Sequence, residues 1–191
     1  MSARTRLTLP GLVFTVMLAG CEDPPDTLTR TDAVALLMAT RHMVFDVSER
    51  VAEFVPVVDT AVPCTGGGQA KVVGTATSDI IEDTVRIEEV AVVTPTGCRV
   101  GVWYTSFTVD GAPGIRREVS VEIVGHQVTI IGGRAEGTVN WQQGDRSGEC
   151  AMNLVLDATV LPPPGDSGLP AGSIKGNMCG HQIELPHSVI D

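Results

Sequence analysis

A period of two in hydrophobicity, running through most of the chain after Cys64, is the feature that most constrains the fold. In residues 115–124, three apolar side chains alternate with polar ones: Val119, Val121 and Ile123 with Glu118, Ser120 and Glu122. Only an extended strand sends successive side chains to opposite faces, so the pattern predicts strands with one dry and one wet face. Glycine and proline separate these segments at short intervals, which favours antiparallel pairing through tight reversals.

About seven strands are expected on this basis. They cover residues 69–79, 84–93, 99–109, 115–124, 127–142 with an interruption at Gly132-Gly133, 148–160 and 173–185. A turn is expected at residues 110–114, and a long loop at residues 162–172. In the second strand the apolar phase shifts at Glu88-Glu89, and such a shift predicts a β-bulge.

One amphipathic helix is predicted before the strands. Thr29-Arg30-Thr31-Asp32 has the pattern of a capping box, and Pro56 ends the helix. Between them, residues at steps of three and four form a stripe: Ala33, Leu37, Thr40, Val44, Val47, Val51 and Phe54. The predicted fold is therefore mainly β (α+β), with this helix packed on a curved antiparallel meander sheet or partial barrel.

The first twenty-one residues have a different character. Arg4 and Arg6 precede a short apolar run, and the run closes with Leu18-Ala19-Gly20-Cys21. The run is shorter than the roughly 20 apolar residues that a helix needs to cross a bilayer, and it contains Pro10. This segment resembles the signal peptide and lipobox of bacterial lipoproteins, and the resemblance covers only these residues.

The resemblance implies that residues 1–20 are a cleaved signal peptide and that Cys21 carries the lipid anchor. The protein would then be exported and held in the bacterial cell envelope by its N-terminal acyl chains. Glu22 follows the cysteine where an aspartate favours retention in the inner membrane of enteric bacteria, so the outer membrane is expected. Residues 21–28 would form a tether, and residues 29–191 a single domain.

The charge of the mature chain excludes one class of partner. Removal of Arg4 and Arg6 leaves 11 basic residues against 23 acidic ones. A surface this acidic repels phosphate backbones, so we expect no binding to nucleic acid. The six aromatic residues that remain offer few stacking platforms.

Four further cysteines, Cys64, Cys98, Cys150 and Cys179, remain in an exported chain, and an even number favours two disulfides. Cys64 and Cys98 are nearly equally distant from the first predicted turn. Cys150 and Cys179 are equally distant from Pro164-Gly165, the middle of the last loop. Because residues that face each other across an antiparallel hairpin are equidistant from its turn, the sequence predicts Cys64–Cys98 and Cys150–Cys179.

Other candidate chemical sites are weak. The glycines of Thr65-Gly66-Gly67-Gly68 lack the ending of a phosphate loop, and Cys179-Gly180-His181 loses its nucleophile if Cys179 is in a disulfide. His181, His187 and Glu184 fit no standard set of metal ligands, and Glu82-Asp83 and Glu88-Glu89 have the character of solvated turn acids. We therefore expect no catalytic residue, no metal site and no cofactor.

Three functional classes remain open. The first is a non-catalytic, lipid-anchored protein that binds a partner or has an assembly role in the envelope. The second is a carrier of an apolar ligand in a half-barrel pocket, and the third is an envelope hydrolase with an unrecognised site. A pocket between helix and sheet would favour the carrier, whereas a solid core would favour the partner-binding protein.

Overall fold

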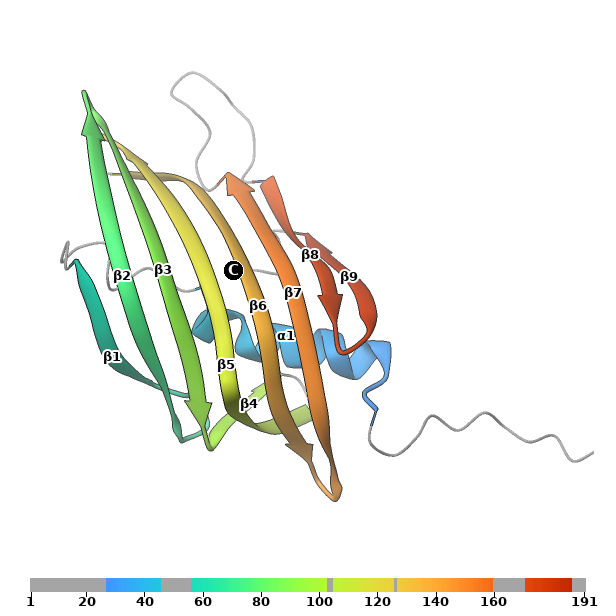
Figure 1. Ribbon diagram of the computed structural model, residues 1–191. Coiled ribbons are helices and arrows are strands. Elements are labelled where there is room, and N and C mark those ends of the chain that lie inside the picture. Colours follow the sequence, from blue (N-terminus) through green and yellow to red (C-terminus); the bar gives the residue numbers. More distant parts are fainter. Residues whose placement is uncertain (1–26, 46–55, 103–104, 126, 160–170, 187–191) are drawn as a thin grey trace, which may run out of the picture.

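A single antiparallel sheet with one helix against it makes up the fold (Figure 1). The computed structural model describes residues 27–45, 56–102, 105–125, 127–159 and 171–186. The elements are α1 (Arg30–Phe45), β1 (Val57–Pro63), β2 (Gln69–Ile81), β3 (Thr84–Thr96), β4 (Cys98–Val102), β5 (Thr105–Val124), β6 (Gln127–Gln143), β7 (Arg146–Thr159), β8 (Ala171–Met178) and β9 (His181–Pro186). The mainly β class is confirmed, but about seven strands is an undercount, because the described residues form nine.

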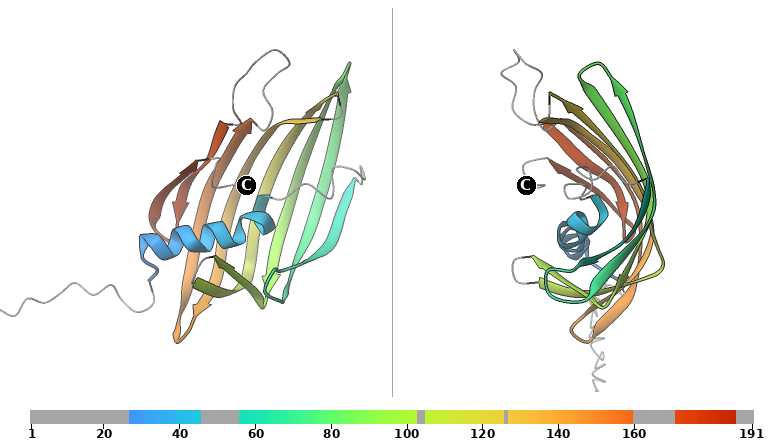
Figure 2. Two further views of the ribbon diagram at one scale, coloured as in Figure 1. Left: turned by 180° about the vertical axis from the view of Figure 1, so that it is seen from behind. Right: turned by 90° about the vertical axis from the view of Figure 1, so that its left-hand side faces the viewer.

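The sheet is a meander with one departure. Its order is β1-β2-β3-β5-β6-β7-β8-β9, and β4 folds back onto the start of β5. All neighbouring strands are antiparallel. The sheet curves around α1 (Figure 2), but β1 and β9 remain its two edges, so it is open and not a closed barrel.

The undercount comes from β1, which was not predicted as a strand from the sequence, and from the position of the turns. The segment expected as one strand at residues 99–109 is divided between β4 and β5, and the last segment is divided into β8 and β9 at Cys179-Gly180. Conversely, the turn predicted at residues 110–114 is wrong: β5 continues through it, with a register shift between Gly111 and Gly114. Glycine in a long strand marks a bend or a close contact as readily as an end.

Gly132-Gly133 illustrates this second use of glycine. The interruption expected there is absent, because β6 runs unbroken through both residues. A Cβ atom added at Gly133 would lie 3.4 Å from Cδ1 of Phe45. Gly133 therefore provides the space in which the last residue of α1 packs on the sheet.

Helix α1 begins as the sequence predicts. The amide of Asp32 donates to Oγ1 of Thr29 (3.2 Å), and the amide of Thr29 donates to the Asp32 carboxylate (3.4 Å), which is the reciprocal pattern of a capping box. Within the described part of the predicted stripe, every member is buried: Ala33, Leu37, Thr40 and Val44. Val47, Val51 and Phe54 lie outside the described residues.

The core lies between α1 and the concave face of the sheet (Figure 2, right). α1 crosses this face and contacts β4, β5, β8 and β9. Leu36, Leu37 and Val44 are at most 1% exposed, as are Val93 on β3 and Ile115 on β5. The space between helix and sheet is thus filled by the chain's own side chains.

A buried ion pair interrupts this apolar interior. Arg117 on β5 is 1% exposed and Glu89 on β3 is 5% exposed. Nε of Arg117 donates to Oε1 of Glu89 (2.9 Å), and its Nη2 atom contacts the same oxygen. Nη1 of Arg117 also donates to the carbonyl of Val44 (3.2 Å), one of the carbonyls that a helix leaves unpaired at its C-terminus.

This pair corrects two predictions. Glu89 is not a solvated turn acid, and β3 has no bulge, because its register with β2 and β5 is continuous through Glu88-Glu89. The apparent shift of phase arises because the inward position at residue 89 holds an acid. Val90 and Val92 occupy outward positions and are 40% and 43% exposed.

We expect Glu89→Ala to lower the free energy of unfolding by about 3 kcal/mol, because it leaves the Arg117 guanidinium buried without its carboxylate. Urea unfolding measures this loss. Glu88→Ala, one residue away on the exposed face, is the control and should change stability by less than about 0.5 kcal/mol. Replacement of both Glu89 and Arg117 by methionine should recover much of the loss. A single-variant loss as small as that of the control would contradict the structural role assigned to the pair.

Candidate functional site

The sequence-predicted site residues fall into two groups. Cys21, the expected lipid anchor, lies outside the described residues, as do the signal segment and most of the tether. The four remaining cysteines form Cys64–Cys98 and Cys150–Cys179, so the predicted pairing is confirmed. Two disulfides indicate an oxidising, extracytoplasmic environment.

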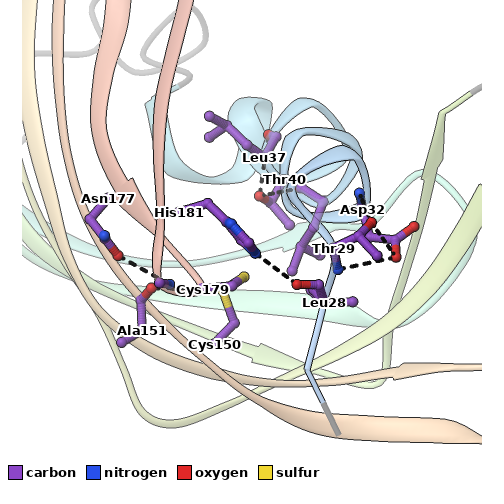
Figure 3. Close-up of a disulfide and its surroundings, with 12 residues drawn as sticks. Leu28, Thr29, Asp32, Leu37, Thr40, Cys150, Ala151, Asn177, Cys179 and His181 are labelled. Atoms are coloured by element: carbon purple, nitrogen blue, oxygen red, sulfur yellow. Dashed lines mark hydrogen bonds between the residues drawn. A yellow bond between two sulfur atoms is a disulfide. The ribbon is translucent and has the colours of Figure 1, made fainter. Parts of the chain in front are cut away.

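The disulfide Cys150–Cys179 joins β7 to the turn between β8 and β9 (Figure 3). Cys179 and Gly180 both have positive φ, 52° and 84°, which suits a two-residue hairpin turn. The Cys179 amide donates to the carbonyl of Ala151 (2.8 Å). Cys179 is therefore part of a structural disulfide and is not a free nucleophile beside His181.

The disulfide Cys64–Cys98 joins the β1–β2 connection to the start of β4. The glycine-rich loop between β1 and β2 packs beside it: the amide of Gly66 donates to the Arg99 carbonyl (2.9 Å), and that of Gly67 to the Cys64 carbonyl (3.0 Å). These amides are used within the protein, and the loop leads into a strand. With these two amides bonded and a strand in place of a following helix, the loop differs from a phosphate loop.

The described chain enters the domain at a junction around Leu28, which lies beside His181 (Figure 3). Nε2 of His181 lies 2.8 Å from the carbonyl oxygen of Leu28, and Arg146 donates to that of Thr27 (2.7 Å). The Leu28 side chain is 3% exposed. Arg146 also pairs with Asp32 at 3.5 Å. We call Thr27, Leu28, Asp32, Arg146 and His181 the tether junction.

The tether junction defines two ends of the molecule. It lies with the β6–β7 turn and both disulfides at one end of the sheet, the tether end. The β2–β3 turn lies at the other, distal end, where the Gly125 amide from the β5–β6 turn donates to the Asp83 carbonyl (3.3 Å). In Figure 1 the N-terminal end of α1 lies on the right, and β2 and β3 meet at the upper left.

The described histidines lie in unremarkable surroundings. His42 is exposed on α1, 3.3 Å from Nε of Arg41, and His181 belongs to the tether junction. Neither ring is hydrogen-bonded to a carboxylate, a serine or a thiol of the described residues. His126 and His187 lie outside that part of the chain. Within it, no three of the histidine, cysteine, aspartate and glutamate residues are grouped to hold a metal ion.

Beyond α1, the concave face becomes progressively less buried toward the distal end. Val119 and Val121 on β5 are 3% and 2% exposed, whereas Val85, Ile87 and Ile123 are half-buried and Ile80 is 67% exposed. The register places Ile80 opposite Val85, and Val85 opposite Ile123. These four side chains, Ile80, Val85, Ile87 and Ile123, form what we call the distal strip.

The convex face carries pairs of opposite charges beside exposed apolar side chains such as Val73, Val90 and Val92. Arg86 on β3 pairs with Glu122 on β5 (3.1 Å), and Arg116 pairs with Glu118 (2.8 Å). The hydrogen bond and the charge of Glu118 raise the pKa of the Arg116 guanidinium above its ordinary value. Exposed pairs of this kind contribute little to stability. These ion pairs keep their part of the convex face solvated.

Sequence reasoning missed the buried ion pair and the tether junction. The alternation of inward and outward positions along each strand could have revealed the ion pair. Glu89 and Arg117 occupy inward positions on strands whose neighbouring inward residues are apolar. The tether junction has no comparable signal, because Leu28, Arg146 and His181 are far apart in the sequence.

Comparison with protein-family models, characterised proteins and solved structures finds no match to this chain. Within the described residues, α1 is too short and too polar to span a membrane.

Removal of one disulfide should destabilise the domain without changing its fold. We expect the double variant Cys150→Ala with Cys179→Ala to lose roughly 3–4 kcal/mol in free energy of unfolding, because the unfolded chain regains the entropy of an open loop. Denaturant titration measures the loss. The matched variant Cys64→Ala with Cys98→Ala should lose a similar amount. A non-reducing peptide map that links Cys64 to Cys150 or Cys179 would show the pairing to be wrong.

Proposed function

We propose that the protein is a lipid-anchored, non-catalytic component of the bacterial cell envelope that binds a protein partner through the surface of its sheet. The filled interior is the observation that carries this proposal. Leu36, Leu37 and Val44 of α1 are buried on the concave face, and Arg117 connects that face to the end of the helix. With the interior occupied, the exposed sheet is the part of the domain available for binding.

The anchor part of the proposal depends on the resemblance of Leu18-Ala19-Gly20-Cys21 to a lipobox. Two disulfides support export to an oxidising compartment. The tether junction supports attachment at the N-terminus, because it holds the start of the domain at one end of the sheet. Acyl chains on Cys21 would then leave the distal end facing away from the lipid, and Glu22 favours the outer membrane.

We expect Cys21→Ser to move the protein from the membrane fraction to the soluble fraction, because the variant cannot accept the diacylglycerol. Immunoblotting of fractions after a salt wash measures the distribution. A conservative exchange in the tether, Glu22→Gln, is the control and should leave the protein in the membrane fraction. If Cys21→Ser protein remains bound to washed membranes, the anchor assignment is wrong.

A carrier of an apolar ligand is the second candidate, and the distal strip is the observation that favours it. Val85, Ile87 and Ile123 are half-buried apolar side chains on a concave surface, which suits contact with an acyl chain or another apolar molecule.

Native mass spectrometry of protein purified from its own membrane separates the two candidates. A partner-binding protein should show the mass of the acylated chain with no further small molecule. A carrier should retain a stoichiometric non-protein mass, and Ile87→Lys should remove that mass while Val92→Lys, on the convex face of the same strand, should not. A retained mass with this dependence would replace the partner-binding proposal by the carrier.

A further inference from the structure

Strand β2 is longer than the edge strand that protects it. β1 pairs with Gln69–Thr75 only, and residues 76–81 of β2 extend beyond its end (Figure 1). At the boundary, the amide of Ala76 donates to the Pro56 carbonyl (3.1 Å). Beyond that bond, the described residues include no strand on the β1 side of this part of β2, whereas β3 pairs with its other side. We call residues 77–81 the open edge.

The register determines which backbone groups face this edge. Because the Ala76 amide points toward β1, the alternation of an extended strand directs the amides and carbonyls of Ser78 and Ile80 the same way. Those of Thr77 and Asp79 face β3, opposite Glu88 and Arg86. No described residue bonds to the outward backbone groups of Ser78 and Ile80. The open edge therefore presents two donors and two acceptors in strand geometry.

Pro56 stands directly before β1, at the boundary of the open edge. The register of β1 on β2 places residue 56 opposite Ala76. A proline there can accept through its carbonyl, as it does, but has no amide to donate back to Ala76. The pairing with β1 therefore loses one hydrogen bond at this point, and no described residue covers the edge beyond it.

The side chains around the open edge combine apolar surface with negative charge. Ile80 and Ile81 are 67% and 64% exposed. Asp79, Glu82 and Asp83 are exposed beside them, whereas the nearby cation Arg86 is already paired with Glu122 at 3.1 Å. A segment that alternates apolar and basic residues would complement this edge, with apolar side chains beside Ile80 and basic ones beside Asp79.

The same charges disfavour a second copy of this chain as the occupant. Two copies that paired through the open edge about a two-fold axis would bring Asp79 near its own equivalent. Like charges opposite each other on neighbouring strands are destabilising, and charged residues on edge strands commonly prevent self-association. The open edge therefore disfavours pairing with a second copy of this chain and favours pairing with a basic strand.

We infer that the open edge of β2 binds an extended segment of a partner protein as an added β-strand, and that this segment alternates apolar and basic residues. The inference depends on the proposed partner-binding function and assigns it to a surface. The open edge lies at the distal end, away from the tether junction, so a bound strand would lie on the far side of the domain from the anchor.

The test uses the full acylated protein in a neutral detergent and a fluorescent nine-residue peptide of alternating lysine and valine. We expect this peptide to bind at least ten times more tightly than a matched peptide of alternating glutamate and valine. Ser78→Pro should weaken binding at least tenfold, because it removes an outward amide without touching the ladder to β3. Ser78→Ala keeps that amide and should bind within twofold of the wild type. A thermal transition establishes that each variant is folded.

Hydrogen exchange locates the bound peptide. The amides of Ser78 and Ile80 should exchange rapidly in the free protein and at least ten times more slowly with the lysine–valine peptide present. Those of Thr77 and Asp79 should be slow in both states, because they face β3. Protection of Ser78 and Ile80 that appears without peptide and grows with protein concentration would identify a second copy as the occupant and overturn the inference.

Two results contradict the inference: equal binding of the two peptides, or undiminished binding to folded Ser78→Pro. In-cell crosslinking separates this failure from failure of the proposed function. A partner that crosslinks equally to wild-type and Ser78→Pro protein would leave partner binding intact and place it on another surface. Loss of crosslinking in Ser78→Pro, with retention in Ser78→Ala, would agree with the peptide result.

Discussion

The contact of Arg117 with both Glu89 and the end of α1 connects the two layers of the fold. A sheet and a helix that meet only through apolar side chains can slide, because dispersion contacts have little directional preference. The guanidinium of Arg117 makes directional hydrogen bonds to a carboxylate on β3 and to the carbonyl of Val44, and these bonds hold α1 in place on the sheet. One side chain therefore links β3, β5 and the end of α1, and leaving it as an isolated buried cation would be costly.

The sequence predicts some elements of this structure well because their signals are local. The capping box at Thr29 and Asp32 and the alternation of β5 and β7 each depend on residues within a few positions of one another. The disulfide pairing was also predictable, since only the equidistance of the cysteines from two turns was needed. The strand count was less accurate, because Gly111 and Gly133 sit within continuous strands, whereas Cys179, a residue that seldom adopts positive φ, forms a turn.

The features most relevant to function were not predictable, and each combines residues distant in the sequence. Glu89 has the pattern of a surface acid until Arg117 is placed opposite it. The open edge of β2 begins where the pairing with β1 ends, beside Pro56, a residue that lies outside β2. Only the folded register shows that the backbone amides and carbonyls of Ser78 and Ile80 face outward, while those of Asp79 face β3. The sequence around each of these residues does not show which distant residue it will contact.

The tether junction also determines how mechanical load enters the domain. If Cys21 carries the proposed anchor, a pull on it would reach Thr27 and Leu28, whose carbonyls contact Arg146 and His181, and then the strands that Cys150–Cys179 joins covalently. The force would then be taken up by the cross-linked strands at the tether end and not by the Arg117 contact at the far end of α1. The envelope could strain the attachment while the distal sheet keeps its shape.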